Sequence, residues 1–203
     1  MKRKIILFIS IFLLLTNNVY AKEVVKLKKC VDGDTFKVII DKKEYTVRML
    51  SIDTPESVKD KNNVEYYGKE SSEYTCKKLT KAKKIELEYD PKSNKFDKYD
   101  RLLAWVFIDN KLLQEELIEK GYAKVAYMYD DYKYNDLLKE KQEIASSKNI
   151  GVWNETTKQE YEKKDKKEAK EEKPENIEVV IITIILLIIT FIFKLLHPKK
   201  RHK

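Results

Sequence analysis

Apolar residues recur with two different periods between residues 22 and 154. Five short stretches alternate apolar and polar residues or are rich in β-branched and aromatic side chains, which predicts strands at 24–31, 35–40, 45–52, 85–89 and 102–108. Three stretches carry apolar residues three and four positions apart, which predicts helices at 69–82, 112–120 and 134–147. Gly121 follows the second helix, where a C-cap is expected. This order predicts an α+β domain built on a five-stranded barrel.

Two hydrophobic segments lie outside this domain, one at each end. Residues 1–21 combine a basic start, an apolar run and a final Ala21, which is typical of a signal peptide cleaved after Ala21; an uncleaved N-terminal anchor is the alternative. Residues 177–196 are apolar apart from Glu178, Lys194 and two threonines, and a helix of that length spans roughly 30 Å. We predict a transmembrane helix, a basic cytoplasmic tail at 197–203, and a domain that faces outward.

The segment between the domain and the predicted span, 155–176, is nearly all Lys, Glu, Asp and Gln, so it cannot form a core. We predict an extended or loosely helical tether, and Pro174 disfavours the alternative of one continuous helix that enters the membrane. A cell-wall sorting signal also ends in an apolar stretch and a basic tail. The sequence carries no LPxTG-like pentapeptide before the stretch, which favours a retained membrane anchor.

The formal net charge of +8 does not by itself indicate a nucleic-acid partner. Three basic residues before position 5 and five from Lys194 onward account for all of it, so residues 22–193 are formally neutral. A prediction of nucleic-acid binding must therefore rest on a local site.

Cys30 and Cys76 are the only cysteines. In an exported chain they either form a disulfide or remain two unrelated thiols. The sequence leaves both alternatives open, because it does not give the distance between the two Cα atoms.

Acidic and basic residues gather at the predicted strand ends. Asp34 lies in the turn at 32–35, and the run from Arg48 to Glu56 leaves the end of the third strand. Either motif alone is typical of a tight turn or a helix start. Together, two carboxylates and a backbone carbonyl supply the hard oxygen ligands that calcium prefers. Glu56 is then positioned to activate or orient a water, while Arg48 and Arg101 clamp a phosphodiester.

These motifs resemble the staphylococcal nuclease family, in order and at matching spacing. Further matching motifs are YGKE at 67–70, AKKIE at 82–86, DKYDR at 97–101, GYAKVAY at 121–127 and NIGVW at 149–153. The resemblance covers essentially all of 22–154. It implies an oligonucleotide-binding (OB-fold) barrel with three helices and a calcium-dependent hydrolysis of DNA and RNA that leaves 3′-phosphate products.

The resemblance also implies a role for individual positions. Asp34 and Asp53 become calcium ligands through their carboxylates, and Thr54 becomes one through its carbonyl. Glu56 becomes the general base. The transition-state clamps are Arg48 and Arg101, and the substrate contacts are Lys98, Tyr99, Tyr127 and Tyr129. No protein partner is predicted, and we expect a monomer.

Asp100 departs from the family pattern, which usually has glycine directly before the arginine. If this position needs a positive φ, aspartate strains the turn, and its carboxylate beside Arg101 weakens the clamp on an anionic substrate. We expect reduced activity rather than none.

A rival interpretation is a non-catalytic nucleic-acid-binding module on the same barrel. Such a module is expected to lose one or more of the catalytic and metal-binding residues. The enzyme interpretation is favoured because all of them are present, namely Asp34, Arg48, Asp53, Glu56 and Arg101.

Overall fold

The computed structural model describes residues 22–57, 64–171 and 175–196, with side chains at 22–57, 64–167 and 180–193. The predicted signal peptide and cytoplasmic tail, 1–21 and 197–203, lie outside the described residues. The chain divides into two compact units, Met1–Lys158 and Gln159–Lys203.

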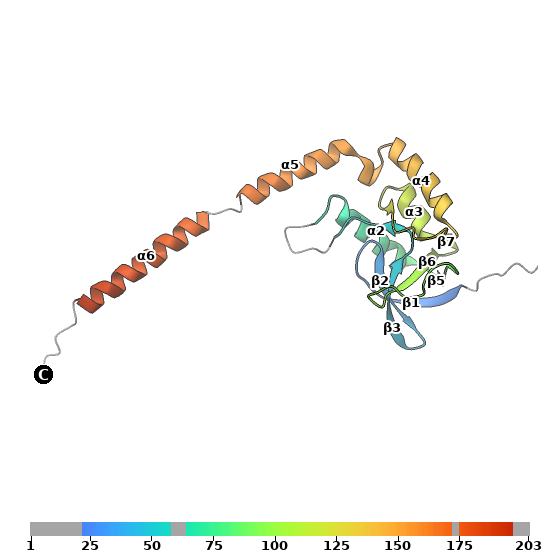
Figure 1. Cartoon of the computed structure of the whole chain (residues 1–203), viewed down its shortest axis with the longest axis horizontal. Coiled ribbons are helices and arrows are strands. Elements are labelled where there is room, and N and C mark those ends of the chain that lie inside the picture. The colour runs from blue at the N-terminus through green and yellow to red at the C-terminus, as the bar shows by residue number, and fades with distance from the viewer. Residues whose placement is uncertain (1–21, 58–63, 172–174, 197–203) are drawn as a thin grey trace, which may run out of the picture. The chain divides into compact units, whose positions relative to one another are not determined.

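The first unit is built on a closed barrel (Figure 1). Its strands are β1 (Glu23–Cys30), β2 (Thr35–Ile40), β3 (Lys43–Met49), β5 (Ile85–Glu88) and β6 (Leu102–Ile108). β1, β2 and β3 form an antiparallel meander, and β5 pairs antiparallel with both β1 and β6. A parallel pairing of β3 with β6 closes the ring, and the short β7 (Lys111–Leu112) extends it at β6. The predicted five-stranded α+β barrel is confirmed.

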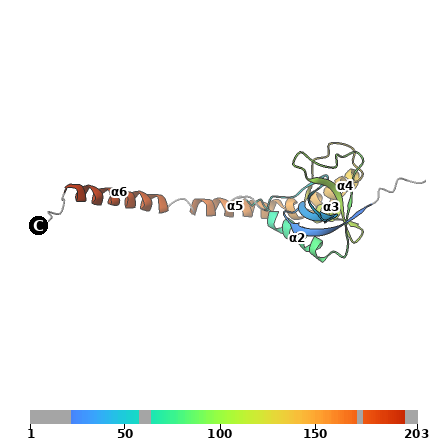
Figure 2. The ribbon, with the colours of Figure 1, turned by 90° about the horizontal axis from the view of Figure 1, so that it is seen from below.

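The barrel interior follows from the period-two pattern of its strands. Phe36, Val38 and Val47 are fully buried, because alternate side chains of β2 and β3 face inward. The predicted helices are present as α2 (Gly68–Lys81), α3 (Leu113–Glu119) and α4 (Asn135–Ser147). α3 and α4 lie side by side (Figures 1 and 2). Each helix contributes a buried leucine to the same core, namely Leu79, Leu117 and Leu138.

The predicted third strand, 45–52, is wrong at its C-terminal end. β3 stops at Met49, and the chain turns through Ser51, whose φ is +58°. It continues as β4 (Ile52–Asp53), which pairs with β8 (Lys124–Val125) in a separate two-stranded sheet. Leu50 and Ile52 are both buried, so the hydrophobic pattern runs on through the turn and hides it. This change of direction brings Asp53 back towards Arg48.

Gly121 ends α3 in the left-handed conformation, with φ +67°, as the predicted C-cap requires. A Cβ on Gly121 would lie 2.3 Å from the carbonyl oxygen of Ile150. Across this contact, the backbone N–H of Val152, in the short helix η1 (Gly151–Trp153), donates to the Gly121 carbonyl at 2.8 Å. The motifs at 121–127 and 149–153 therefore meet only because Gly121 and Gly151 have no side chains.

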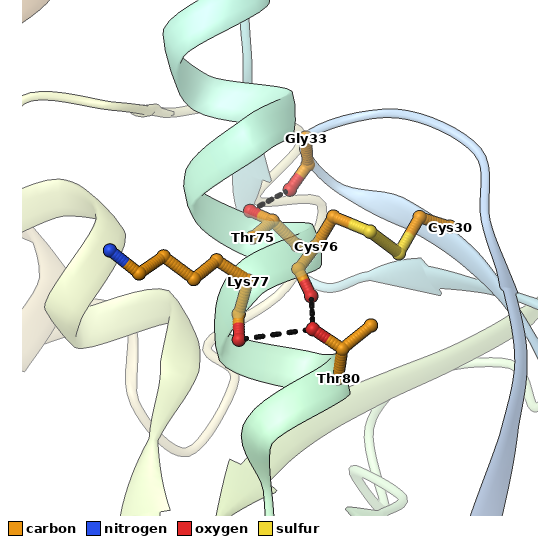
Figure 3. Close-up of a disulfide and its surroundings, with 6 residues drawn as sticks. All are labelled: Cys30, Gly33, Thr75, Cys76, Lys77 and Thr80. Atoms are coloured by element: carbon orange, nitrogen blue, oxygen red, sulfur yellow. Dashed lines mark hydrogen bonds between the residues drawn. A yellow bond between two sulfur atoms is a disulfide. The ribbon is translucent and has the colours of Figure 1, made fainter.

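A disulfide joins Cys30 to Cys76, with a Cα–Cα distance of 5.6 Å, which decides between the alternatives left open by the sequence (Figure 3). It connects the end of β1 to α2. Next to it, Thr75 Oγ1 donates to the Gly33 carbonyl at 2.7 Å. Both bonds hold the β1–β2 loop, which carries Asp34, against α2.

The charged segment after the domain is helical rather than extended, as α5 (Glu155–Glu171), and α6 spans Glu175–Leu196. The predicted membrane span, 177–196, lies on α6. No helix within the described residues combines the length and the apolar character needed to cross a membrane, so the structure does not support this prediction.

Candidate active site

The residues predicted to act together line one cleft of about 1050 Å³. They come from the β1–β2 loop, from β3 and β4, from the loop before β6 and from the segment after β8. None of the predicted residues lies elsewhere. They are Asp34, Arg48, Asp53, Thr54, Glu56, Lys98, Tyr99, Arg101, Tyr127 and Tyr129.

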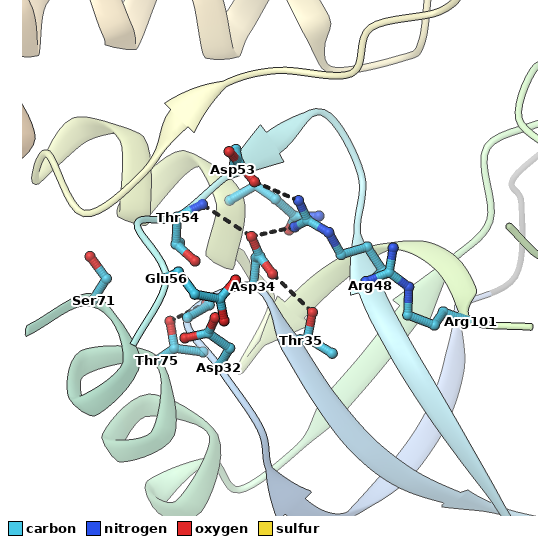
Figure 4. Close-up of polar contacts among 12 residues, drawn as sticks. Asp32, Asp34, Thr35, Arg48, Asp53, Thr54, Glu56, Ser71, Thr75 and Arg101 are labelled. Carbon is cyan, nitrogen blue, oxygen red and sulfur yellow. Dashed lines mark hydrogen bonds and ion pairs between the residues drawn. The ribbon is translucent and has the colours of Figure 1, made fainter. Parts of the chain in front are cut away.

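Arg48 lies between two carboxylates (Figure 4). Its Nη1 is 2.5 Å from Asp34 Oδ2, and its Nη2 donates to Asp53 Oδ1 at 2.9 Å. The side chains of Arg48 and Asp34 are only 10% and 8% exposed, whereas that of Asp53 is 47% exposed. The arginine is therefore fixed in a water-poor position, where its charge acts strongly on any bound anion.

Further hydrogen bonds fix the Asp34 carboxylate. The backbone N–H of Thr54 donates to Oδ2 at 3.0 Å, and Thr35 Oγ1 donates to Oδ1 at 2.9 Å. The Met49 N–H donates to the Asp34 carbonyl at 3.0 Å. Gly33 permits the close approach of this loop, because a Cβ there would lie 2.6 Å from Thr54 Oγ1. Asp34 is thus held to Thr54 through its side chain and to Met49 through its backbone.

The electrostatics of this cluster suit a hard cation. Burial raises the pKa of Asp53 above its ordinary value; the Arg48 charge partly offsets this, and the Asp34 charge adds to it. In the described part of the chain, Thr54 Oγ1 is buried without a hydrogen-bond partner. Two carboxylates that share one guanidinium, beside a buried hydroxyl, form an oxygen-rich site that accepts more positive charge. The residues fit calcium on these grounds.

The predicted calcium set contains two carboxylates and one backbone carbonyl. Across the described residues, no three His, Cys, Asp or Glu side chains are grouped to hold a metal. Calcium binding therefore stays a prediction that rests on the donor chemistry of Asp34, Asp53 and Thr54.

Glu56 follows the β4 segment directly and lines the same cleft. Figure 4 shows its side chain gathered with those of Asp34 and Asp32. Its backbone N–H donates to Glu65 Oε2 at 3.1 Å. Gly68, the first residue of α2, brings that helix against Glu56, because a Cβ there would lie 2.4 Å from the Glu56 carbonyl oxygen. The position of Glu56 thus depends on the start of α2.

Arg101 enters the cleft from the loop before β6 and is held by Asp97. Its Nε donates to Asp97 Oδ2 at 2.7 Å, and its backbone N–H donates to Oδ1 at 3.0 Å. Burial raises the pKa of Asp97, but the N–H groups of Arg101 and Tyr99 and the guanidinium outweigh burial and hold this pKa below its usual value. Asp97 therefore stays charged and orients Arg101.

Sequence reasoning gave no role to two acidic residues that support the site. Asp97 is one, and its position four residues before Arg101 was the available signal. The other is Asp32, which is buried and accepts a hydrogen bond from Ser57 Oγ at 2.5 Å. The turn motif at 32–35 contains it, but a turn aspartate and a supporting aspartate look alike in sequence.

Asp100 has a φ of +59°. It closes the connection between Asp97 and Arg101, in which the Asp100 N–H donates to the Asp97 carbonyl at 3.1 Å and the Asp97 N–H donates to the Arg101 carbonyl at 3.0 Å. This end of a short connection favours glycine. Asp100 therefore has the positive φ at which we expected an aspartate to strain the turn.

Exposed aromatic rings lie at the rim of the cleft. Tyr99, Tyr127 and Tyr129 are 67%, 53% and 82% exposed. The Arg48 guanidinium carbon lies 5.5 Å from the centre of the Tyr127 ring, and that of Arg101 lies 5.4 Å from the Tyr99 ring. Lys98 Nζ is 5.0 Å from the Tyr99 ring. Such rings beside cations suit the stacking of bases next to a bound phosphate.

Comparisons with known proteins agree with this geometry. The family model described as staphylococcal nuclease homologue matches residues 46–155. Endonuclease YncB of Bacillus subtilis is 41% identical over 133 residues, which cover 65% of this chain and 62% of YncB. The prophage-derived endonuclease YokF of the same organism is 43% identical over 131 residues, 64% of this chain and 44% of YokF. A thermonuclease of Staphylococcus hyicus is 36% identical over 129 residues, 64% of this chain and 75% of that protein. The chain thus matches less than two thirds of the length of the two Bacillus relatives.

Proposed function

The chain belongs to the staphylococcal nuclease family, and on that premise we propose that it is a calcium-dependent endonuclease that hydrolyses DNA and RNA to 3′-phosphate products outside the cell. Its relatives carry the names endonuclease and thermonuclease. The calcium dependence, the substrates and the location are the parts that we add.

The observation that carries the proposal is the arrangement around Arg48. A buried guanidinium between the carboxylates of Asp34 and Asp53 places a fixed positive charge beside oxygen ligands, with Arg101 and Glu56 in the same cleft. A phosphodiester that is hydrolysed in this cleft gains negative charge in the transition state. Arginines that are already held in place stabilise that charge.

Each residue then has a separate task. Asp34 and Asp53 would hold calcium through their carboxylates, and Thr54 would hold it through its carbonyl. When bound, calcium would supply Lewis-acid stabilisation of charge on a phosphoryl oxygen. Glu56 accepts a proton from, or orients, that water.

Two arginines bind the phosphoryl oxygens. Among the described residues, Arg48 Nη1 is buried against Asp34 and has no aligned hydrogen bond, so this nitrogen acts on a bound phosphodiester through the charge of the guanidinium. Asp97 keeps Arg101 oriented towards the same group. Lys98 supplies charge at the rim, and the three tyrosines supply faces for bases.

The location outside the cell, in a chain held at the membrane by residues 177–196 and acting as a monomer, is proposed from sequence alone. The support is the signal-like start at 1–21 and the apolar composition of 177–196. Membrane fractionation of the full chain, compared with a chain that ends at 171, tests the anchor. Recovery of both chains in the soluble fraction would contradict it.

The activity is tested on the full chain with single-stranded DNA and with RNA, in calcium and in chelator. We expect cleavage to 3′-phosphate ends that requires calcium and falls about 10² to 10⁴-fold in Glu56→Gln, which keeps the shape of the side chain but removes its basicity. Glu65→Gln is a matched control, because it makes the same change in the acid that contacts the Glu56 backbone. If wild type binds DNA but cuts no faster than Glu56→Gln, the chain is a binding module.

A further inference from the structure

The outer face of β2 and β3 continues from the cleft onto a row of lysines. Thr35, which lines the cleft, lies opposite Arg48, and Lys37 lies opposite Thr46. Side chains of a strand alternate between its faces, so Lys37 is on the same face as Thr35 and Arg48, about 7 Å further along. The face that carries the Arg48 side chain therefore extends out of the cleft towards Lys37.

β1 adds three lysines to this face. Lys29 lies directly opposite Lys37, and Lys26 lies opposite Ile39 on the same side of the sheet. The register shifts between Leu27 and Lys29, which leaves Lys28 as an extra residue in a bulge. All three β1 lysines are exposed. We call Lys26, Lys28, Lys29 and Lys37 the lysine track.

The track is electrostatically unfavourable in the isolated chain. Like charges directly opposite each other on paired strands destabilise a sheet, as for Lys29 and Lys37. Lys37 is paired with Glu44 at 2.7 Å. In the described part of the chain, no ion pair involves the three β1 lysines. The pKa of Glu44 is lowered by the Lys37 hydrogen bond and by the charges of Lys37, Lys28 and Lys29, which shows that these cations share one region.

We propose that the lysine track binds the phosphodiester backbone of a nucleic-acid strand that extends out of the cleft. The proposal rests on the proposed function, because the strand is the substrate held at Arg48. Two observations favour this occupant: the charge of the track is complementary to a polyanion, and the track begins on the face that carries Arg48. A bulge beside a site is a common way to aim an extra side chain at a ligand.

The size of the effect follows from counterion release. Each phosphate neutralised on a single strand contributes about −0.7 to the slope of log K against log salt concentration. Loss of two lysine contacts therefore makes the slope less negative by about 1.4. The same two contacts correspond to a roughly ten-fold weaker affinity at about 0.15 M salt.

The test uses the full chain with Lys28→Gln and Lys29→Gln together. The matched control is Lys120→Gln with Lys148→Gln, which removes the same charge from two exposed positions at the ends of α3 and α4. Fluorescence anisotropy across a salt series measures the binding of single-stranded DNA of about 20 nucleotides. A strand of this length extends beyond the nucleotides that the cleft itself holds. Cleavage of this strand is compared with that of a trinucleotide.

For the track variant we expect the salt slope to become less negative by about 1.4 and KM for the long strand to rise roughly ten-fold. Its kcat and its cleavage of the trinucleotide should match wild type, and the control variant should match wild type throughout. If the track variant and the control bind the long strand equally well while both cut it, the track proposal is overturned and the nuclease proposal survives. If no form cuts any substrate, the nuclease proposal fails, and the salt slopes still decide about the track. Loss of binding to vesicles of anionic lipid, with DNA binding intact, would assign the track to a membrane surface instead and also overturn the proposal.

Discussion

Replacing Asp100 separates two effects that the structure places at one residue. Its φ of +59° is a conformation that costs a residue with a Cβ about 1 kcal/mol, less for aspartate than for most, and costs glycine nothing. Asp100 also directly precedes Arg101 in the sequence, and Arg101 lines the cleft that we propose binds a phosphodiester. Asp100→Gly removes both the strain and the charge, whereas Asp100→Asn removes only the charge.

The two magnitudes can be estimated separately. Relief of the turn should raise the free energy of unfolding of Asp100→Gly by up to about 1 kcal/mol, or roughly 4 °C in Tm. Coulomb's law gives a repulsion of about 0.5 kcal/mol between two unit negative charges roughly 8 Å apart in water, and about twice that where the effective dielectric constant is half as large. Removing it should therefore raise kcat/KM roughly two- to five-fold in both variants.

Thermal unfolding and steady-state cleavage of single-stranded DNA measure the two quantities. Asp100→Asn should gain activity with little change in Tm, and Asp100→Gly should gain both. If Asp100→Asn leaves kcat/KM unchanged at low ionic strength, the charge argument is refuted. If Asp100→Gly does not raise Tm relative to Asp100→Asn, the strain argument is refuted.

Three further changes test the supports of the site. Asp97→Asn should lower kcat about ten-fold, because Arg101 loses the carboxylate that orients it. The pKa of Asp97 lies below its ordinary value, so the stability that this carboxylate adds is present above about pH 4 and is lost as the pH falls through the lowered pKa. The free energies of unfolding of wild type and variant, measured in urea, should therefore converge at low pH. Gly68→Ala should lower kcat, because the new Cβ displaces the Glu56 backbone. A lower Tm with an unchanged kcat would contradict this. Replacing both Cys30 and Cys76 by serine should lower the free energy of unfolding by about 4 kcal/mol, since the disulfide closes a loop across 46 positions. Reductant should lower the Tm of wild type but not that of the double variant, as measured by thermal unfolding.

Local patterns predicted most of the fold, and the family resemblance implied most of the site. Alternating residues marked β2 and β6 at their observed ends, because each strand buries one face and side-chain direction alternates. The helices followed from apolar residues three and four apart. Asp34 and Arg48 share one cleft because antiparallel pairing places the start of β2 opposite the end of β3.

The sequence by itself determined which residues belong to the barrel and the helices, because those assignments depend on period and residue type, and its resemblance to the staphylococcal nuclease family implied which residues share the cleft. Only the tertiary structure decided the turn at Ser51, the Cys30–Cys76 bridge, the positive φ at Asp100 and the hold of Asp97 on Arg101. These features depend on backbone angles and on distances between segments far apart in the chain. Neither quantity is encoded in a local pattern, because the same residues allow several turns and several partners until the closed barrel selects one.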